Sequence, residues 1–252
     1  MKHQSNPLPQ TLLTFTLLCG ALTAVLALGS ILTASNTALP TDGGVGLDAG
    51  DVPSAITVVI DAGHGGEDGG TQSADGMYEK DINLEIARML EVMLRANGIC
   101  TVMTRTEDVL LYDRGVDYQG RKKVLDLAAR RRIAEETENG VLVSIHMNAF
   151  PEERYRGLQV FYSPNDTRSC DLAERIQGTA QKYLQPENNR KIKKATSSIY
   201  LLDRLQCPAV LVECGFLSNP QEAALLSEEN YRRELAFVLF CAVMDYISSQ
   251  NA

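Results

Sequence analysis

Residues Val58–Gly70, VVIDAGHGGEDGG, join an apolar run to a glycine-rich segment that contains a histidine. The apolar run from Ile56 to Ile60 is rich in β-branched residues, which is typical of a buried strand. The run stops at Asp61, and His64 follows among glycines, whose backbone reaches conformations closed to other residues. Because the chain has three histidines in all, one in this position is a candidate functional residue.

Predicted strands and helices alternate along the chain after this first strand. Further strands are expected at 99–104, 141–145, 158–162, 198–202 and 209–212, and helices at 79–97, 121–138, 169–184 and 227–247. Strands that are apolar throughout and alternate with helices indicate an α/β fold. We therefore expect a single domain with a mostly parallel, twisted central sheet and helices on both faces.

The helix expected at 121–138 is rich in charge. Its inward face is predicted to consist of Leu125, Ala128, Ala129 and Ile133. The three consecutive arginines Arg130 to Arg132 are interpreted as a solvated face, with room for one of them to turn inward.

The N-terminal part of the chain differs in composition from the rest. Residues 11–34 are almost wholly apolar and, at about 1.5 Å per residue, are long enough to cross a bilayer core of about 30 Å. Residues 1–10 carry Lys2 and acidic residues follow the segment, so the positive-inside rule places 1–10 in the cytoplasm. Residues 35–55 have the composition of a linker, and the globular domain is expected over 56–252. The protein is then membrane-anchored with its domain outside the cytoplasmic membrane, or secreted if residues 11–34 are a cleaved signal peptide.

Composition argues against several classes of protein. The formal net charge is −8 and there is no tryptophan, whereas nucleic-acid binding needs a basic surface. Six cysteines are present without a C-x-x-C spacing, and one of them falls in the apolar N-terminal segment. Neither a disulfide framework nor a cysteine zinc site is therefore expected.

Polar side chains gather where three of the predicted strands end. The strand ends read Asp61-Ala62-Gly63-His64, Ser144-Ile145-His146-Met147-Asn148 and Val212-Glu213-Cys214-Gly215-Phe216. Ligands bind at the carboxyl ends of strands in such sheets. Zinc sites are built from imidazoles and carboxylates with one position open, so His64 and His146 with one carboxylate would suffice.

The carboxylate has two candidates. Glu79 begins the first predicted helix, where an acid is also favoured by the helix dipole alone. Glu67 is a weaker rival within the glycine-rich segment. Asp61 and Asn148 are candidates for orienting the metal ligands through hydrogen bonds to them, or for closing turns. The basic segment 188–194, NNRKIKK, is interpreted as a solvated loop, with contact to anionic glycan or lipid as the alternative.

Four blocks together resemble one family. IDAGHGGEDGG (60–70), EKDINLEIA (79–87), VSIHMNA (143–149) and PAVLVECGFLSNPQEA (208–223) are similar to the zinc-dependent N-acetylmuramoyl-L-alanine amidases. The resemblance implies an enzyme that cuts the amide bond between N-acetylmuramic acid and L-alanine in peptidoglycan. It implies His64, Glu79 and His146 as ligands of Zn²⁺ and Glu213 as the catalytic glutamate.

A narrower resemblance is to the CwlD-type amidases of sporulation and germination. It rests on residues 188–219 together with the N-terminal apolar segment and the compact domain. It implies a role in spore cortex maturation, where removal of the peptide precedes formation of muramic-δ-lactam, and an accessory protein or lipoprotein as partner. Some members of the wider family insert an inhibitory helix before the catalytic glutamate. The predicted elements between His146 and Glu213 leave no room for one.

Two alternatives to this function stay open at the level of sequence. One is another zinc carboxypeptidase or amidohydrolase on the same scaffold. The other is an inactive wall-binding module. Retention of Glu213, for which a binding module has no use, argues against the second.

Overall fold

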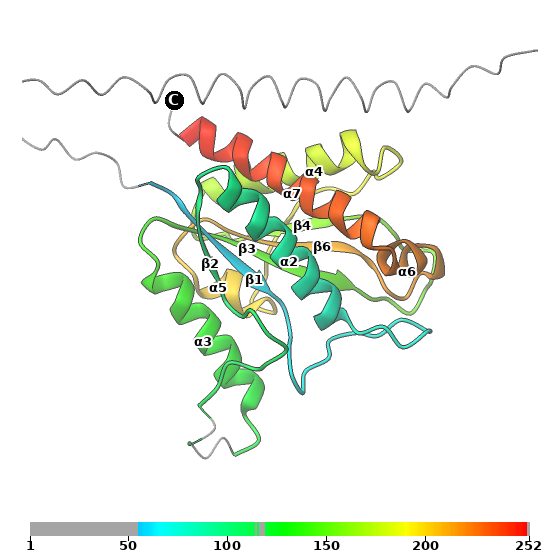
Figure 1. The fold of residues 1–252 in the computed structure, drawn as a ribbon, viewed down its shortest axis with the longest axis horizontal. Coiled ribbons are helices and arrows are strands. Elements are labelled where there is room, and N and C mark those ends of the chain that lie inside the picture. The colour runs from blue at the N-terminus through cyan, green and yellow to red at the C-terminus, as the bar shows by residue number, and fades with distance from the viewer. Residues whose placement is uncertain (1–54, 114, 116–118, 251–252) are drawn as a thin grey trace, which may run out of the picture. The chain divides into compact units, whose positions relative to one another are not determined.

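The structure, a computed structural model, describes residues 55–113, 115 and 119–250 (Figure 1). Six strands form one sheet in the order β2-β1-β3-β6-β4-β5. Their bounds are β1 Thr57–Ala62, β2 Cys100–Met103, β3 Gly140–Asn148, β4 Gln159–Tyr162, β5 Lys193–Lys194 and β6 Ala209–Phe216. The first four strands of that order run parallel, while β4 is antiparallel to β6 and β5 is parallel to β4. The prediction of a mostly parallel sheet is confirmed.

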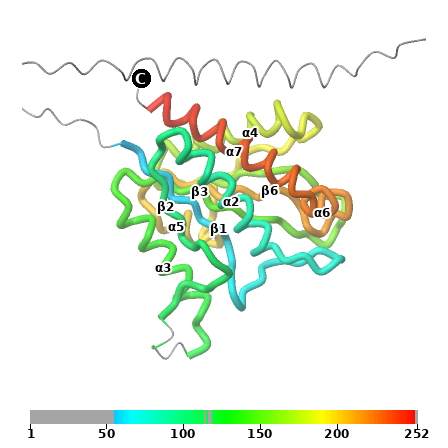
Figure 2. The backbone as a smooth tube through the Cα atoms, viewed as in Figure 1, coloured from blue at the N-terminus to red at the C-terminus, as the bar shows by residue number. Residues whose placement is uncertain are grey.

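Helices cover both faces of the sheet, as predicted (Figures 1 and 2). One face is packed by α2 (Glu79–Ala96), α4 (Arg168–Tyr183), α6 (Pro220–Ser227) and α7 (Glu229–Gln250). The other face is packed by α3 (Lys122–Glu136) and α5 (Tyr200–Arg204). Because the inner strands contribute side chains to both apolar clusters, they are buried on both sides, which explains their continuous hydrophobic runs.

Helix α2 follows its sequence pattern closely. Ile82, Ile86, Leu90 and Leu94, each one turn apart, are all buried. Glu79 and Asp81 stand in the first turn, where the helix dipole favours acids. Gly98, with φ of +78°, follows the last turn, as expected of a residue that ends a helix in the left-handed region.

The strand predicted at 198–202 is wrong. Ser198 and Ile199 lie in the turn before the short helix α5, and residues 200–202 begin that helix. Leu201 of α5 is buried together with Leu205 just beyond the last turn. The apolar run of four residues, 199–202, fits a strand and a helical turn equally well, so periodicity cannot separate them. The edge strand is β5 instead, two exposed lysines that carry no strand signal.

The helix predicted at 227–247 is confirmed as α7, but the separate helix α6 that precedes it was not predicted. The chain forms α6 first and breaks at Glu228, whose backbone is extended, before α7 begins. Asn219 caps α6 by accepting hydrogen bonds from the backbone N–H groups of Gln221 and Glu222, and Pro220 is at the first helical position. This Asn-Pro pair is a start signal that the sequence does contain.

The inward face of α3 differs from the predicted one. The buried residues are Asp126, Arg130 and Ala134, spaced by four, whereas Ala128 is exposed. A charged stripe can face inward here because Arg130 is ion-paired both with Asp126 and with Asp61. One of the three arginines therefore does turn inward.

Within the part of the chain that the structure describes, no helix combines the length and apolarity needed to cross a bilayer. The segment predicted to do so, 11–34, lies outside the described residues, as does most of the predicted linker.

Candidate functional site

Three of the sequence-predicted residues meet at the carboxyl ends of β1 and β3. His64 follows β1, His146 lies near the end of β3, and Glu79 is the first residue of α2. One donor atom from each lies within 4.8 Å of the others. The Oε1 atom of Glu79 is 2.9 Å from Nδ1 of His146 and 3.3 Å from Nε2 of His64. Two imidazoles and one carboxylate in this arrangement can hold a metal ion.

Glu79 is held in place by the backbone. Its Oε1 accepts a hydrogen bond from the N–H of Met147 at 3.0 Å, and its Oε2 accepts one from Thr71 at 2.9 Å. Burial acts to raise the pKa of Glu79, but hydrogen bonds and charge from His146 and His64 hold it far below its ordinary value. Glu79 is therefore ionised at neutral pH, as a metal ligand must be.

Glu67, the rival carboxylate, does not join the cluster. Its side chain is exposed and lies 2.5 Å from Nζ of Lys122. The structure thus separates the two acids that the sequence left open, and it groups Glu79 with the histidines.

His64 has an uncommon backbone conformation. Its φ is +61°, a left-handed value that a residue other than glycine adopts at some cost. Its carbonyl oxygen accepts a hydrogen bond of 2.6 Å from Nη2 of Arg130. Its Nδ1 lies 3.0 Å from Oδ2 of Asp68, so that Nε2 is the nitrogen nearer to Glu79.

Glu213 lies beside this cluster because of strand register. Strands β3 and β6 pair His146 with Glu213, so their side chains extend from the same face of the sheet. The Oε2 atom of Glu213 is buried and has no hydrogen-bond partner among the described residues. Burial raises the pKa of Glu213 to about 7. A carboxyl group of this kind can gain and lose a proton near neutral pH.

Asp61 anchors the ends of the strands. It is fully buried and accepts hydrogen bonds from Thr104 Oγ1 at 2.7 Å, Ser144 Oγ at 2.6 Å and Arg130 Nη1 at 2.8 Å. Ser144 is two residues before His146 on the same face of β3, so Asp61 fixes the strand that carries the histidine.

We expect the contribution of Asp61 to stability to disappear at low pH. Burial acts to raise its pKa, but the charge of Arg130 and the hydroxyl of Ser144 lower it from 3.8 to about 2. A carboxyl with a depressed pKa stabilises the fold above its unfolded-state pKa and ceases to do so as the pH falls through the folded-state value. The deficit of Asp61→Asn in free energy of unfolding should therefore shrink by roughly 2 kcal/mol between pH 6 and pH 2. Urea unfolding of both proteins at the two pH values measures this, and an unchanged deficit would contradict it.

Two functional groupings were not predicted from the sequence. Arg105 is buried, and its guanidinium donates to the carbonyl oxygens of Ala62 at 2.8 Å and Gly63 at 3.0 Å. Burial beside Arg130 lowers the pKa of Arg105 to about 10, so it remains charged at neutral pH. Together Arg105 and Arg130 hold the backbone that leads into His64. Nothing in the local sequence around Arg105 distinguishes it from a surface arginine.

An amide also reaches the cluster, but not the predicted one. Nδ2 of Asn83, one turn after Glu79 in α2, donates to Glu79 Oε1 at 3.3 Å and to the carbonyl of Gly63 at 3.1 Å. Asn148 instead accepts a hydrogen bond from Leu217 through its backbone carbonyl at 2.9 Å. Its side chain makes no hydrogen bond to the three clustered residues.

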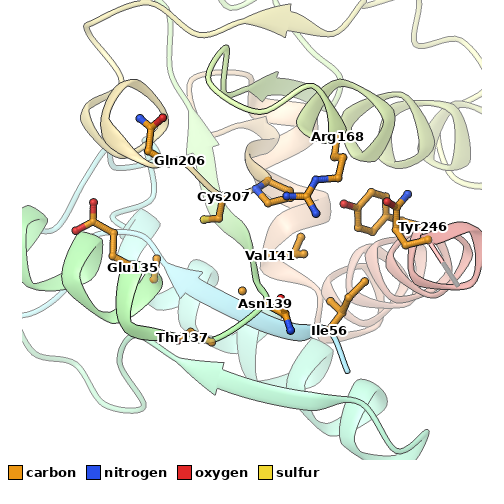
Figure 3. Close-up of a pocket in the computed structure, with 13 residues that line it drawn as sticks. Ile56, Glu135, Thr137, Asn139, Val141, Arg168, Gln206, Cys207 and Tyr246 are labelled. Atoms are coloured by element: carbon orange, nitrogen blue, oxygen red, sulfur yellow. The ribbon is translucent and has the colours of Figure 1, made fainter. Parts of the chain in front are cut away.

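A cavity of about 570 Å³ lies at the opposite end of the sheet, next to the amino ends of the parallel strands (Figure 3). Arg168, Tyr246 and Cys207 are among the residues that line it. It contains none of the clustered residues, and burial raises the pKa of the Cys207 thiol, which makes that thiol a poor nucleophile. The candidate chemistry is therefore at the carboxyl end.

Comparison with known proteins agrees with this site. The family described as N-acetylmuramoyl-L-alanine amidase matches residues 58–243. The germination-specific N-acetylmuramoyl-L-alanine amidase of Bacillus subtilis is 33% identical over 198 residues, which cover 79% of this chain and 82% of that protein.

Solved structures agree as well. The CwlD amidase from Clostridioides difficile, in complex with the GerS lipoprotein, is 36% identical with a TM-score of 0.72 and covers 77% of this chain and 99% of that one. An N-acetylmuramoyl-L-alanine amidase from Clostridium difficile 630 is 34% identical with a TM-score of 0.67, covering 77% and 98%. The chain therefore belongs to the N-acetylmuramoyl-L-alanine amidase family, hydrolases whose substrate is peptidoglycan, and it is similar within that family to the CwlD-type enzymes.

Proposed function

We propose that this enzyme is zinc-dependent, with His64, Glu79 and His146 as the ligands and Glu213 as the catalytic base and acid. The observation that carries the proposal is the convergence of the three donor atoms within 4.8 Å, with Glu213 in register beside His146. The bond cut is the amide between the lactyl group of N-acetylmuramic acid and L-alanine.

The residues present fit a zinc ion. Two imidazoles and one carboxylate are a common donor set for catalytic zinc, which keeps a further position open. The buried, unpartnered Oε2 of Glu213 supports the same reading, because such an atom is costly unless a bound group or substrate pairs with it. When bound, zinc would supply Lewis-acid chemistry, lowering the pKa of water and polarising a carbonyl oxygen.

A side chain of the protein, that of Glu213, carries out the proton transfers. Glu213 takes a proton from the attacking water and later delivers it to the departing alanine nitrogen. The raised pKa of Glu213 suits both steps. A carboxyl group with a pKa near 7 can accept a proton from water in one step and donate it in the next at neutral pH. Asp61, Arg105 and Arg130 keep the strand ends fixed while this happens.

Gly63 provides a direct test of the ligand geometry. A Cβ at this position would lie 2.2 Å from Nε2 of His146, so Gly63→Ala should displace the imidazole ring. We expect zinc affinity to fall roughly 10–100-fold or more, the effect seen when groups that orient a ligand are altered. Gly178→Ala is the matched control, because its Cβ would meet nothing within 4 Å. Chelator competition measures both affinities, and equal values would show that the ring tolerates the methyl group.

We further propose that the substrate is spore cortex peptidoglycan and that removal of its peptide precedes formation of muramic-δ-lactam. The similarity to the germination-specific amidase and to CwlD supports this. The complex of CwlD with a lipoprotein supports a lipoprotein partner here too. Residues 11–34 are proposed to anchor the chain, with the catalytic domain outside the cytoplasmic membrane.

Digestion of purified peptidoglycan tests the proposal. The full chain is incubated with zinc and, in parallel, with a lipoprotein partner where one is encoded alongside it, and the products are identified by mass spectrometry. Free stem peptides that begin with L-alanine, together with peptide-free muramic acid, are expected. Loss of only a terminal residue would indicate a carboxypeptidase. Binding without any product under both conditions would indicate a wall-binding module.

A further inference from the structure

Strand register extends the site beyond Glu213. Gln159 of β4 is the cross-strand partner of Glu213, which is itself the partner of His146. Directly paired residues extend from the same face of a sheet. The side chains of His146, Glu213 and Gln159 therefore form a row, with neighbouring strands about 4.8 Å apart.

Arg190 continues this row. Its Nη1 donates to Gln159 Oε1 at 2.9 Å and its Nε donates to the carbonyl of Arg156 at 2.7 Å. The guanidinium carbon lies 4.5 Å from the centroid of the Phe216 ring, three residues beyond Glu213. These contacts fix the guanidinium in one position but leave Nη2 without an acceptor among the described residues.

Positive charge exceeds negative charge along this edge. Glu222 interacts electrostatically with Arg190, but its carboxylate oxygens accept hydrogen bonds from the N–H groups of Gly157 and Phe216, and it forms no direct ion pair with Arg190 among the described residues. Lys193 is exposed and pairs with Phe161, which is two residues from Gln159 and so on the same face. The segment 190–194 has four basic residues and no acid, in a chain of net charge −8. This edge is suited to an anionic ligand.

The substrate carries its anionic groups on the peptide side of the bond that is cut. In peptidoglycan stems the residue after L-alanine bears an α-carboxylate or its amide, whereas the sugar beside the bond is uncharged. That carboxyl group is separated from the scissile nitrogen by one Cα–Cα step and one covalent bond at each end, which together span at most roughly 7 Å. Glu213, which delivers the proton to that nitrogen, is one strand spacing, about 4.8 Å, from its partner Gln159. Nη1 of Arg190 is a further 2.9 Å from Oε1 of Gln159, so the stem peptide can span the distance from Glu213 to Arg190.

We propose that Arg190, supported by Lys193, forms a subsite that binds the α-carboxylate of the stem-peptide residue following L-alanine. The inference rests on the proposed function, because it locates the subsite from Glu213. The N–H groups of Nη2 and the second N–H of Nη1 can still donate to a carboxylate. The contacts of the guanidinium with Gln159 and Phe216 hold it in position for this. Arg190 is thus a residue that determines specificity, without a part in the proton transfers.

Two muramyl peptides test the subsite, identical except that this α-carboxyl group is free in one and a carboxamide in the other. The full chain should favour the free acid about ten-fold in kcat/KM. Arg190→Gln should remove the preference by raising KM for the acid while kcat stays within about two-fold, and Lys193→Gln should reduce it in part. Arg132→Gln, an exposed arginine of α3, is the matched control and should keep the preference.

A binding measurement separates failure of the subsite from failure of the proposed function. Calorimetric titration of Glu213→Gln with both peptides should show tighter binding of the acid, and the double variant with Arg190→Gln should lose the difference. If wild type cleaves neither peptide but this difference is present, the subsite stands and the proposed reaction fails. If the peptides bind and react equally well, or if Arg190→Gln weakens both to the same extent, the subsite is overturned.

Discussion

Glu213→Gln leaves zinc bound and removes nearly all hydrolysis. Glutamine has almost the same shape but cannot carry the proton, and general acid–base catalysis typically contributes about 10²–10⁴-fold. We therefore expect kcat to fall by at least roughly a thousand-fold, because one residue serves both proton transfers. The variant should also unfold at a higher temperature in the metal-free state, since it no longer carries a buried group whose ionisation is disfavoured by burial.

The measurement is release of stem peptide from purified peptidoglycan, together with zinc content by atomic absorption. Glu136→Gln is a matched control, because this glutamate lies on the exposed side of α3. If Glu213→Gln kept wild-type turnover, another group would have to be the base. If the variant lost its zinc, the loss of activity would report on the metal site instead.

His146→Ala empties the proposed metal site. The substitution removes one of three ligands and also the hydrogen-bond partner of Glu79 Oε1 at 2.9 Å. Catalytic zinc is held by three protein ligands, and only two would remain in this variant. We therefore expect bound zinc to fall from near one equivalent per chain to near zero. Activity should fall to the background level and should not return at millimolar zinc.

Glu67→Gln distinguishes the two acids in the same experiment. Glu67 pairs with Lys122 at the surface, so its variant should keep both zinc and activity. Chelation should lower the melting temperature of the wild type, because a ligand that binds only the folded state stabilises it. The same treatment should leave His146→Ala unchanged. Full zinc content in His146→Ala would exclude this ligand set.

Several features of the site could be predicted from the sequence because they depend on local pattern. Apolar runs define the parallel strands, and the residues directly after them must then meet at one edge of the sheet. That reasoning brings His64, His146 and Glu213 together, and the structure places all three at that edge. Glu79 needed the start of α2 to be identified, and its acid-rich first turn gave that signal.

Other features depend on contacts that no local pattern encodes. Arg105 holds the carbonyl of Gly63, 42 residues away, and Arg130 holds that of Ala62, 68 residues away. The local sequence around a buried arginine does not differ from that around a solvated one. Only the folded chain shows which carbonyl oxygens an arginine can reach. The inward stripe of α3 was mispredicted for this reason.

By itself the sequence determined the parallel strands of the sheet, their carboxyl edge and the residues that converge there, since hydrophobic periodicity and chain direction are sufficient for these. Tertiary structure alone decided which arginines and amides support the histidines, why His64 can adopt a left-handed backbone, and that Arg190 lies in a row with Glu213. The physical reason is that hydrogen bonds and strand register connect residues that are far apart in the chain. The distances between such residues are fixed only when the strands have paired into the sheet.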